Sequence, residues 1–214
     1  MVYIPASLDL VDTQAQIINN ILQALVPQVD KYFKKTLKAV SPKIQAVVID
    51  AIKAAPEYQS LLSGQLKAEF GLPDSDTRLN SIMGFWQNIN VEYKTITVGR
   101  SVLKGGFVIN MIKRDFSDII NSSVAILTTE KGTDLNWLEW LLLFGNQTII
   151  KDYNVELGPN PRSRTGMAVM KGVISGKWSV PAEYSGTINN NWITRSIDSI
   201  EGEIQNILLK AFKD

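Results

Sequence analysis

The sequence contains no cysteine and no histidine among its 214 residues. Without cysteine the chain offers neither a disulfide nor a thiolate metal site. Without histidine it lacks the Ser-His-Asp and Cys-His triads, histidine-based zinc sites and the most common general base. These absences remove the most common catalytic and metal-binding arrangements. Because the chain also offers no complete catalytic set of another kind, we expect no enzymatic activity, no cofactor, no resident metal and no small-molecule substrate. Carboxylate pairs are the remaining candidates for catalysis.

Long hydrophobic runs are also missing. The most apolar stretch is WLEWLLLFGN at residues 137–146, where residues 140–144 are uninterrupted by a polar side chain. A membrane-spanning helix needs about 20 consecutive apolar residues. The N-terminal segment MVYIPASLDLVD has no basic region before an apolar stretch, so it does not resemble a signal peptide. These features predict no membrane partner and synthesis in the cytoplasm.

Charge of either sign is not in excess. The chain has 22 Lys and Arg against 21 Asp and Glu, a formal net charge of +1. The overall charge therefore gives no general attraction to nucleic acid or to an anionic membrane, although a local patch would escape this argument.

The first part of the chain has the apolar spacing of helices. Pro27 is expected to kink or break the first helix, because proline lacks the amide proton. Ser41 followed by Pro42 is typical of the start of a new helix. A short helix at residues 58–70 is expected to end at Gly71.

Beyond residue 90 the pattern changes to β-rich segments between Gly, Ser and Asp turns. These segments are residues 91–98, 105–113, 122–129, 148–157 and 173–181. Residues 190–212 then predict a closing helix. We expect an α+β fold with N-terminal helices, an antiparallel sheet of about four to five strands with one inserted apolar helix, and a long C-terminal helix. The predicted division is a helical region at 1–90 and an α+β core at 91–214, with one continuous domain as the alternative.

Two motifs are candidates for chemistry. GVISGKW at residues 172–178 differs from a phosphate-binding P-loop, because its spacer is one residue short and Trp178 replaces the hydroxyl residue. A glycine-bounded hairpin turn is the favoured interpretation. Asp74-x-Asp76 and Asp115-x-x-Asp118 have a spacing that suits a divalent cation, but both pairs lie where helix caps are expected.

Basic side chains gather in two places. Lys31, Lys34, Lys35 and Lys38 form a stripe along a predicted helix, and either a solvated face or a contact with phosphates explains it. Residues 157–182 contain four basic residues and no acid, among them Arg162 and Arg164. This loop either is a disordered surface segment or meets an acidic neighbour subunit or nucleic acid.

The helix predicted at 137–144 is apolar around most of its circumference. At 100° per residue, one face carries Trp137, Trp140, Leu141 and Phe144. Such a helix must be covered on nearly all sides. Burial in the chain's own core is one explanation. A subunit interface is the other, since Trp and Phe are enriched in interface cores.

Three segments resemble the neck, or tail-completion, proteins of long-tailed bacteriophages. SGQL at 63–66 resembles the first signature of that family, and LLLFGN at 141–146 resembles its aromatic-Gly-Thr turn. NNWITRSIDSIEGEIQNILLKAF at 190–212 resembles its closing helix, with Trp192 in the aromatic position. The match runs from about residue 40 to 214. Leu143 stands where the family often has Glu, and Asn146 where it usually has Thr.

The resemblance implies a non-enzymatic virion protein that forms a homo-oligomeric ring at the head–tail junction. Its partners would be other neck and tail proteins and DNA passing through the channel. In that reading, Trp137, Trp140, Leu141, Phe144, Arg162 and Arg164 serve the subunit interface, and the lysine stripe serves phosphate contact. A tail terminator, a baseplate component and a nucleic-acid-binding module remain alternatives, as does a metal-dependent carboxylate enzyme at Asp74 and Asp76.

Overall fold

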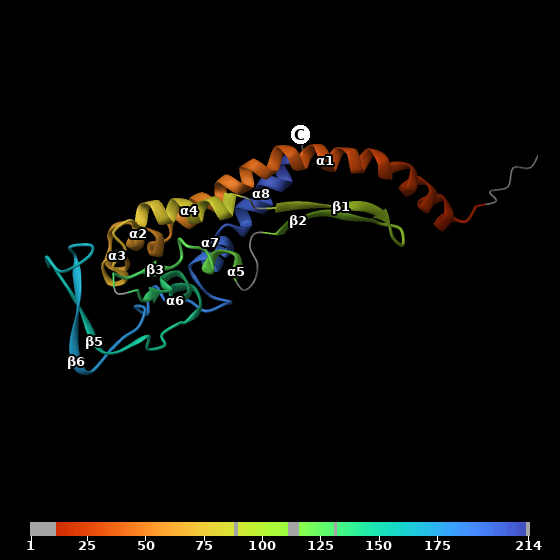
Figure 1. The fold of residues 1–214 in the computed structure, drawn as a ribbon. Helices are drawn as coiled ribbons and strands as arrows, with labels where there is room; N and C mark the ends of the chain where they lie inside the picture. Colours follow the sequence, from red (N-terminus) through yellow and green to blue (C-terminus); the bar gives the residue numbers. More distant parts are fainter. Residues whose placement is uncertain (1–11, 88–89, 111–115, 131, 213–214) are drawn as a thin grey trace, which may run out of the picture.

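A computed structural model describes residues 12–87, 90–110, 116–130 and 132–212. Its longest element is helix α1, Gln14–Ala54. Thr13 caps the N-terminus of α1 through a reciprocal pair of hydrogen bonds with Gln16, which satisfies amide protons that the first helical turn leaves free. Figure 1 shows α1 arching along one edge of the molecule and ending among the shorter helices.

Helix α1 runs unbroken through Pro27, where the sequence predicts a kink or a break, and the new helix expected at Pro42 is wrong. Both prolines lie inside α1, on its exposed side. Each proline deprives one carbonyl group of its amide partner, but the affected residues, Gln23 and Lys38, are exposed, so water can satisfy those groups. The buried stripe of α1 continues past Pro42 and holds the helix together across it. That stripe consists of Thr36, Val40, Ile44, Val48 and Ile52.

Three shorter helices follow α1: α2 (Pro56–Ser63), α3 (Gln65–Phe70) and α4 (Ser75–Gln87). The single helix expected at 58–70 is therefore two helices, separated at Gly64. The Ser60 hydroxyl accepts a hydrogen bond from the Leu66 amide across this break, at 3.0 Å. Helix α3 ends at Gly71, as expected from the sequence, with the left-handed conformation that favours glycine.

The fold is α+β, but the expected sheet of four to five strands is wrong. The described strands form three separate antiparallel pairs. The pairs are β1 (Asn90–Val98) with β2 (Leu103–Asn110), β3 (Leu127–Thr128) with β4 (Asp134–Leu135), and β5 (Ile150–Leu157) with β6 (Ala168–Trp178). Figure 1 shows β1–β2 lying along α1, and β5–β6 projecting from the other end of the molecule.

The segment expected as a strand at 122–129 explains part of this difference. Only its last residues pair as β3. Before them, the Arg78 guanidinium of α4 donates hydrogen bonds to the carbonyl oxygens of Val124 and Ile126, at 3.1 and 2.8 Å. A side chain thus satisfies the backbone groups that a neighbouring strand would otherwise bind.

The remaining helices close the core. They are α5 (Ser117–Ile120), α6 (Trp137–Leu143), α7 (Trp192–Ser199) and α8 (Glu201–Ala211). The long C-terminal helix expected at 190–212 is therefore interrupted at Ile200. Trp192 is fully buried, and its indole N–H donates to the Ile52 carbonyl at 3.1 Å, which ties α7 to the end of α1. The hydrophobic core draws residues from both sides of the predicted boundary at residue 90.

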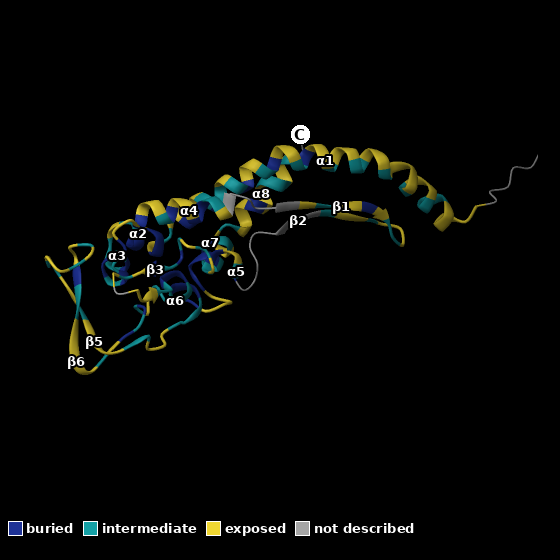
Figure 2. Cartoon of the chain, in the orientation of Figure 1, coloured by how far each residue is buried: buried dark blue, intermediate teal, exposed yellow. Residues whose placement is uncertain are grey.

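Burial is uneven along the molecule. Figure 2 shows the buried residues gathered around α2, α3, α6 and α7, whereas the N-terminal half of α1 and the hairpin β5–β6 are largely exposed. Across the described ranges, none of the helices combines the length and the apolar character that crossing a membrane requires.

Candidate functional site

The apolar helix α6 is covered by its own chain. Trp137 and Leu141 are fully buried, and the Trp137 indole N–H donates to the Val124 carbonyl at 3.1 Å. Their side chains therefore cannot touch a second subunit directly. Trp140 and Phe144 are only half-buried. Of the interface residues predicted on this helix, Trp140 and Phe144 are the two whose side chains remain accessible to a second subunit.

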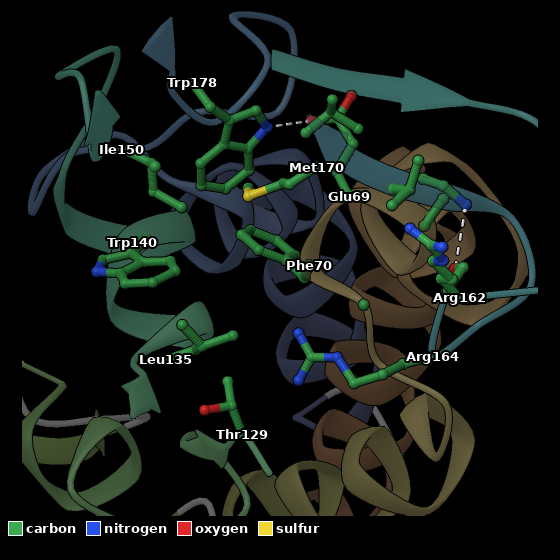
Figure 3. Close-up of a pocket in the computed structure, with 16 residues that line it drawn as sticks. Glu69, Phe70, Thr129, Leu135, Trp140, Ile150, Arg162, Arg164, Met170 and Trp178 are labelled. Carbon is green, nitrogen blue, oxygen red and sulfur yellow. Dashed lines mark hydrogen bonds between the residues drawn. The ribbon is translucent and has the colours of Figure 1, made fainter. Parts of the chain in front are cut away.

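Trp140 faces a pocket of about 260 Å³ between α3, α6 and the hairpin β5–β6. Its floor is aromatic. The Trp178 ring meets the edges or faces of Phe70 and Trp140 at centroid separations of 5.6 and 6.1 Å, in T-shaped arrangements that aromatic quadrupoles favour. Met170 fills the space beside them (Figure 3). The pocket therefore has a rigid apolar base.

Glu69 is the carboxylate among the residues that line this pocket. One of its oxygens accepts a hydrogen bond from the Trp178 indole N–H at 2.8 Å, and the other accepts one from the side-chain amide of Gln65 at 2.6 Å. Figure 3 shows the bond to Trp178 at the upper edge of the pocket. Glu69 therefore holds the tryptophan ring in place.

The arginine-bearing loop forms the rim. It spans residues 158–167, because the remainder of the predicted loop belongs to strand β6. Its own hydrogen bonds order it: the Arg162 amide donates to the Asn160 side chain at 2.9 Å, and the Ala168 amide donates to the Ser163 hydroxyl at 3.3 Å. The loop is thus a folded feature of the surface.

Arg164 lies against the C-terminal end of α3. A Cβ atom added to Gly71 would approach a guanidinium nitrogen of Arg164 to 3.0 Å. Helix C-termini carry partial negative charge, which favours a cation at this place. Within the described ranges neither Arg162 nor Arg164 has a carboxylate as an ion-pair partner.

A positive rim above an aromatic floor suits a carboxylate or phosphate that is joined to an apolar group. The expectation that these arginines bind acidic groups of a neighbouring subunit stays a prediction.

The lysine stripe divides into two parts. Lys34 forms an ion pair with Asp30 at 2.7 Å, and its ammonium lies 5.4 Å from the centre of the Tyr93 ring on β1. The Tyr93 hydroxyl donates a short hydrogen bond to the same Asp30 carboxylate. Lys34 therefore helps to attach the hairpin β1–β2 to α1. The other three members of the stripe, Lys31, Lys35 and Lys38, are exposed.

The attachment of β1 to α1 shifts the pKa values of Asp30 and Tyr93. The hydrogen bond from Lys34, followed by that from Tyr93, holds the pKa of Asp30 below its ordinary value. Loss of solvent, reinforced by the bond to Asp30, raises the pKa of Tyr93 to about 12. The carboxylate is thus kept charged and the phenol neutral over the physiological range.

The predicted carboxylate pairs are not brought together as a metal site. Asp74 forms an ion pair with Arg78 at 2.9 Å, which lowers the pKa of Asp74 and orients the guanidinium toward the carbonyls before β3. Asp76 is exposed in the first turn of α4, and Asp118 is exposed on α5. Asp115 lies outside the described residues. Within the described ranges no three carboxylate, histidine or cysteine side chains gather to hold a metal ion.

GVISGKW forms a bulge in the middle of β6, and not the hairpin turn that the sequence favoured. Opposite Asp152 the pairing register shifts, and residues 173–176 leave the ladder. The Ser175 amide donates to the Asp152 carboxylate at 3.2 Å. Ile174, at the outside of this bulge, is 95% exposed.

Sequence reasoning misses the pocket itself. It selects Arg162, Arg164 and Trp140 one by one, but nothing in their spacing indicates that β5–β6 brings them above α3. Glu69 and Trp178 carry no functional signal in the sequence, because their hydrogen bond joins residues far apart in the chain.

The chain matches no protein-family model, no curated protein and no solved structure.

Proposed function

We propose that this chain is a non-enzymatic structural subunit of a bacteriophage virion, which assembles with copies of itself into a ring at the head–tail junction. The observation that carries the proposal is the position of exposed apolar side chains at two opposite ends of an elongated subunit. The resemblance of three segments to neck proteins supports the location in the virion.

One apolar surface is the N-terminal part of α1. Residues 14–29 contain no charged side chain. Ile21 and Leu25 are 54% and 40% exposed on this part of the helix. An uncharged helical stretch with large apolar side chains in water indicates a surface that a partner covers.

The other apolar surface is the hairpin β5–β6 at the far end of the molecule (Figure 1). Ile174 is 95% exposed, with Tyr153 and Val173 exposed beside it, and Leu157 is 58% exposed at the C-terminal end of β5. The hairpin packs on the core through Val155, Met170 and Trp178, but most of its other side chains are exposed, and a two-stranded hairpin with little cover is only marginally stable in water. Contact with a second chain would stabilise it.

These two surfaces differ in structure and lie at opposite ends of the subunit (Figure 1). A contact between one surface and the other on the next copy is heterologous, and repetition of such a contact produces a ring when the rotation closes. Trp140 and the arginine rim lie next to β5–β6 and would border the contact. This arrangement is what a ring-forming subunit requires.

The experiment is the substitution Ile174→Asp, followed by sedimentation velocity over a range of protein concentrations. Ile174 contributes little to the packing of the monomer, so the melting temperature should not change appreciably. Burial of an isoleucine contributes about 2–3 kcal/mol, so the substitution should weaken association at least about 30-fold.

Ile188→Asp is the matched control, because Ile188 is also exposed, at 47%, and lies on neither surface. It should assemble like the unmodified protein. If Ile174→Asp assembles as well as the control does, the hairpin is not part of the contact and the proposed arrangement is wrong.

A further inference from the structure

Positive charge is concentrated in one part of the molecule, here named the basic lobe. It consists of α1 residues 30–49 together with the hairpin residues 92–108. The lobe contains eight basic and two acidic residues, a net charge of +6, so the rest of the chain, with its total of +1, carries −5. The basic residues are Lys31, Lys34, Lys35, Lys38, Lys43, Lys94, Arg100 and Lys104.

The two segments of the lobe are held together as one unit. The Asp30 carboxylate on α1 accepts hydrogen bonds from the Tyr93 hydroxyl and the Ile96 amide of β1. Ile96 is buried between the two segments. Figure 1 shows the hairpin running beside α1, with its turn toward the N-terminal half of that helix. The lysines of α1 and the basic residues of the hairpin therefore belong to one projecting body.

The lobe has two acidic side chains, of which the exposed one, Glu92, offsets part of its positive charge. Asp30 has a side-chain exposure of only 18% and is neutralised by Lys34. Lys31, Lys35 and Lys38, by contrast, are exposed and lie on one side of α1 at helical spacing. Lys94, Arg100 and Lys104 are exposed on the hairpin.

We propose that the basic lobe binds the phosphate backbone of double-stranded DNA without reading its sequence. Lysine is a compact point charge that recognises phosphate without fixed geometry, and a net charge of +6 on so few residues gives a strong local attraction to a polyanion. The tyrosine rings of the lobe already have partners: the Tyr32 ring lies 6.1 Å from the Phe212 ring, and the Lys34 ammonium lies 5.4 Å from the centre of the Tyr93 ring. Base stacking, which single-stranded nucleic acid requires, is therefore not favoured.

DNA would be a partner of the virion subunit proposed above. The inference rests on that proposed function in one respect only, the head–tail junction as the place where the protein meets DNA. The same distribution of charge between the lobe and the rest of the chain would also suit a different binding partner. The lobe of one copy would also attract the negatively charged remainder of the next copy. Salt-sensitive association between subunits, without DNA binding, is the result that this alternative predicts.

The test is the binding of a labelled random-sequence DNA duplex of about 30 base pairs to the full chain, measured by fluorescence anisotropy across a salt series. If about four basic side chains contact phosphates, the slope of log K against log salt is about −3.6, and a fourfold rise in salt weakens binding about 150-fold. Duplexes of unrelated sequence should bind equally.

Three variants, each losing three positive charges, locate the surface. The helix variant combines Lys31→Gln, Lys35→Gln and Lys38→Gln, and the hairpin variant combines Lys94→Gln, Arg100→Gln and Lys104→Gln. Each should weaken binding at least about tenfold and flatten the salt slope by about 0.9 for every phosphate that is no longer neutralised. The control variant, outside the lobe, combines Lys53→Gln, Lys151→Gln and Lys177→Gln, and should change binding much less.

Absence of DNA binding at low salt overturns the inference. Equal losses of affinity in all three variants also overturn it, because general charge would then explain the binding. If the hairpin variant binds DNA with unchanged affinity, the hairpin is not part of the DNA-binding surface, which contradicts the lobe as defined. Sedimentation of the same samples separates the two proposals: a ring that does not bind DNA refutes only the lobe, and a monomer that binds DNA refutes only the ring.

Discussion

The ion pair between Glu57 and Arg195 permits a quantitative prediction about stability. The Glu57 side chain on α2 is 3% exposed, whereas its partner on α7 is 39% exposed. Arg195→Met would leave a buried carboxylate without its cation. Breaking a buried pair in this way costs about 3–5 kcal/mol, but the arginine end is open to solvent, so screening reduces the expected loss to about 2 kcal/mol.

Urea unfolding, followed by tryptophan fluorescence, measures this loss in a double-mutant cycle. For a chain of this length, a loss of about 2 kcal/mol corresponds to a fall in melting temperature of about 4–8 °C. Adding Glu57→Gln to Arg195→Met removes the unpaired charge, so the double variant should be more stable than the single Arg195→Met variant. The described ion pair does not exist in solution if Arg195→Met is as stable as the unmodified protein. The same follows if the losses of stability caused by Arg195→Met and Glu57→Gln simply add in the double variant.

Two further predictions concern the loop rim and the attachment of the hairpin. Gly71→Ala should destabilise the protein by about 1–2 kcal/mol in a thermal melt, because φ is positive there and the new methyl group would press on the Arg164 guanidinium. Combining it with Arg164→Ala should recover part of that loss, and no recovery would place the arginine elsewhere. Asp30→Asn should lower the pKa of Tyr93, now about 12, in a tyrosinate absorbance titration read against Tyr93→Phe, and an unchanged pKa would mean that the bond is absent. Because the folded pKa of Tyr93 is raised, its contribution to stability is complete below about pH 10 and is lost as pH rises through about 12. The pKa of Asp30 is lowered, so its contribution is present above its ordinary value and is lost as pH falls through the folded value.

Local patterns in the sequence predict the α+β class and several helix boundaries. Gly71 ends α3 as expected, because its requirement for a left-handed conformation is a property of one residue. The new helix expected at Pro42 is wrong because proline is judged locally, whereas α1 is held by a buried stripe that continues from Val40 to Ile44 and beyond. Tertiary packing decides this outcome.

The expected sheet is wrong for a related reason. A β-rich pattern predicts an extended segment, but it does not identify what satisfies the backbone of that segment. Arg78 takes the place of a neighbouring strand before β3, and its role depends on α4 lying there. The pocket depends likewise on Trp178 reaching Glu69 from the far end of β6. Interactions between such distant residues leave no periodic signal.

The ring itself is tested by native mass spectrometry of the full chain over a concentration series, with negative-stain imaging of any large species. The proposed heterologous contact predicts one closed, discrete assembly that gains population with concentration. Its images should show a ring, and Ile174→Asp should deplete it. A strict monomer at every concentration, or a two-fold symmetric dimer, would contradict the proposal.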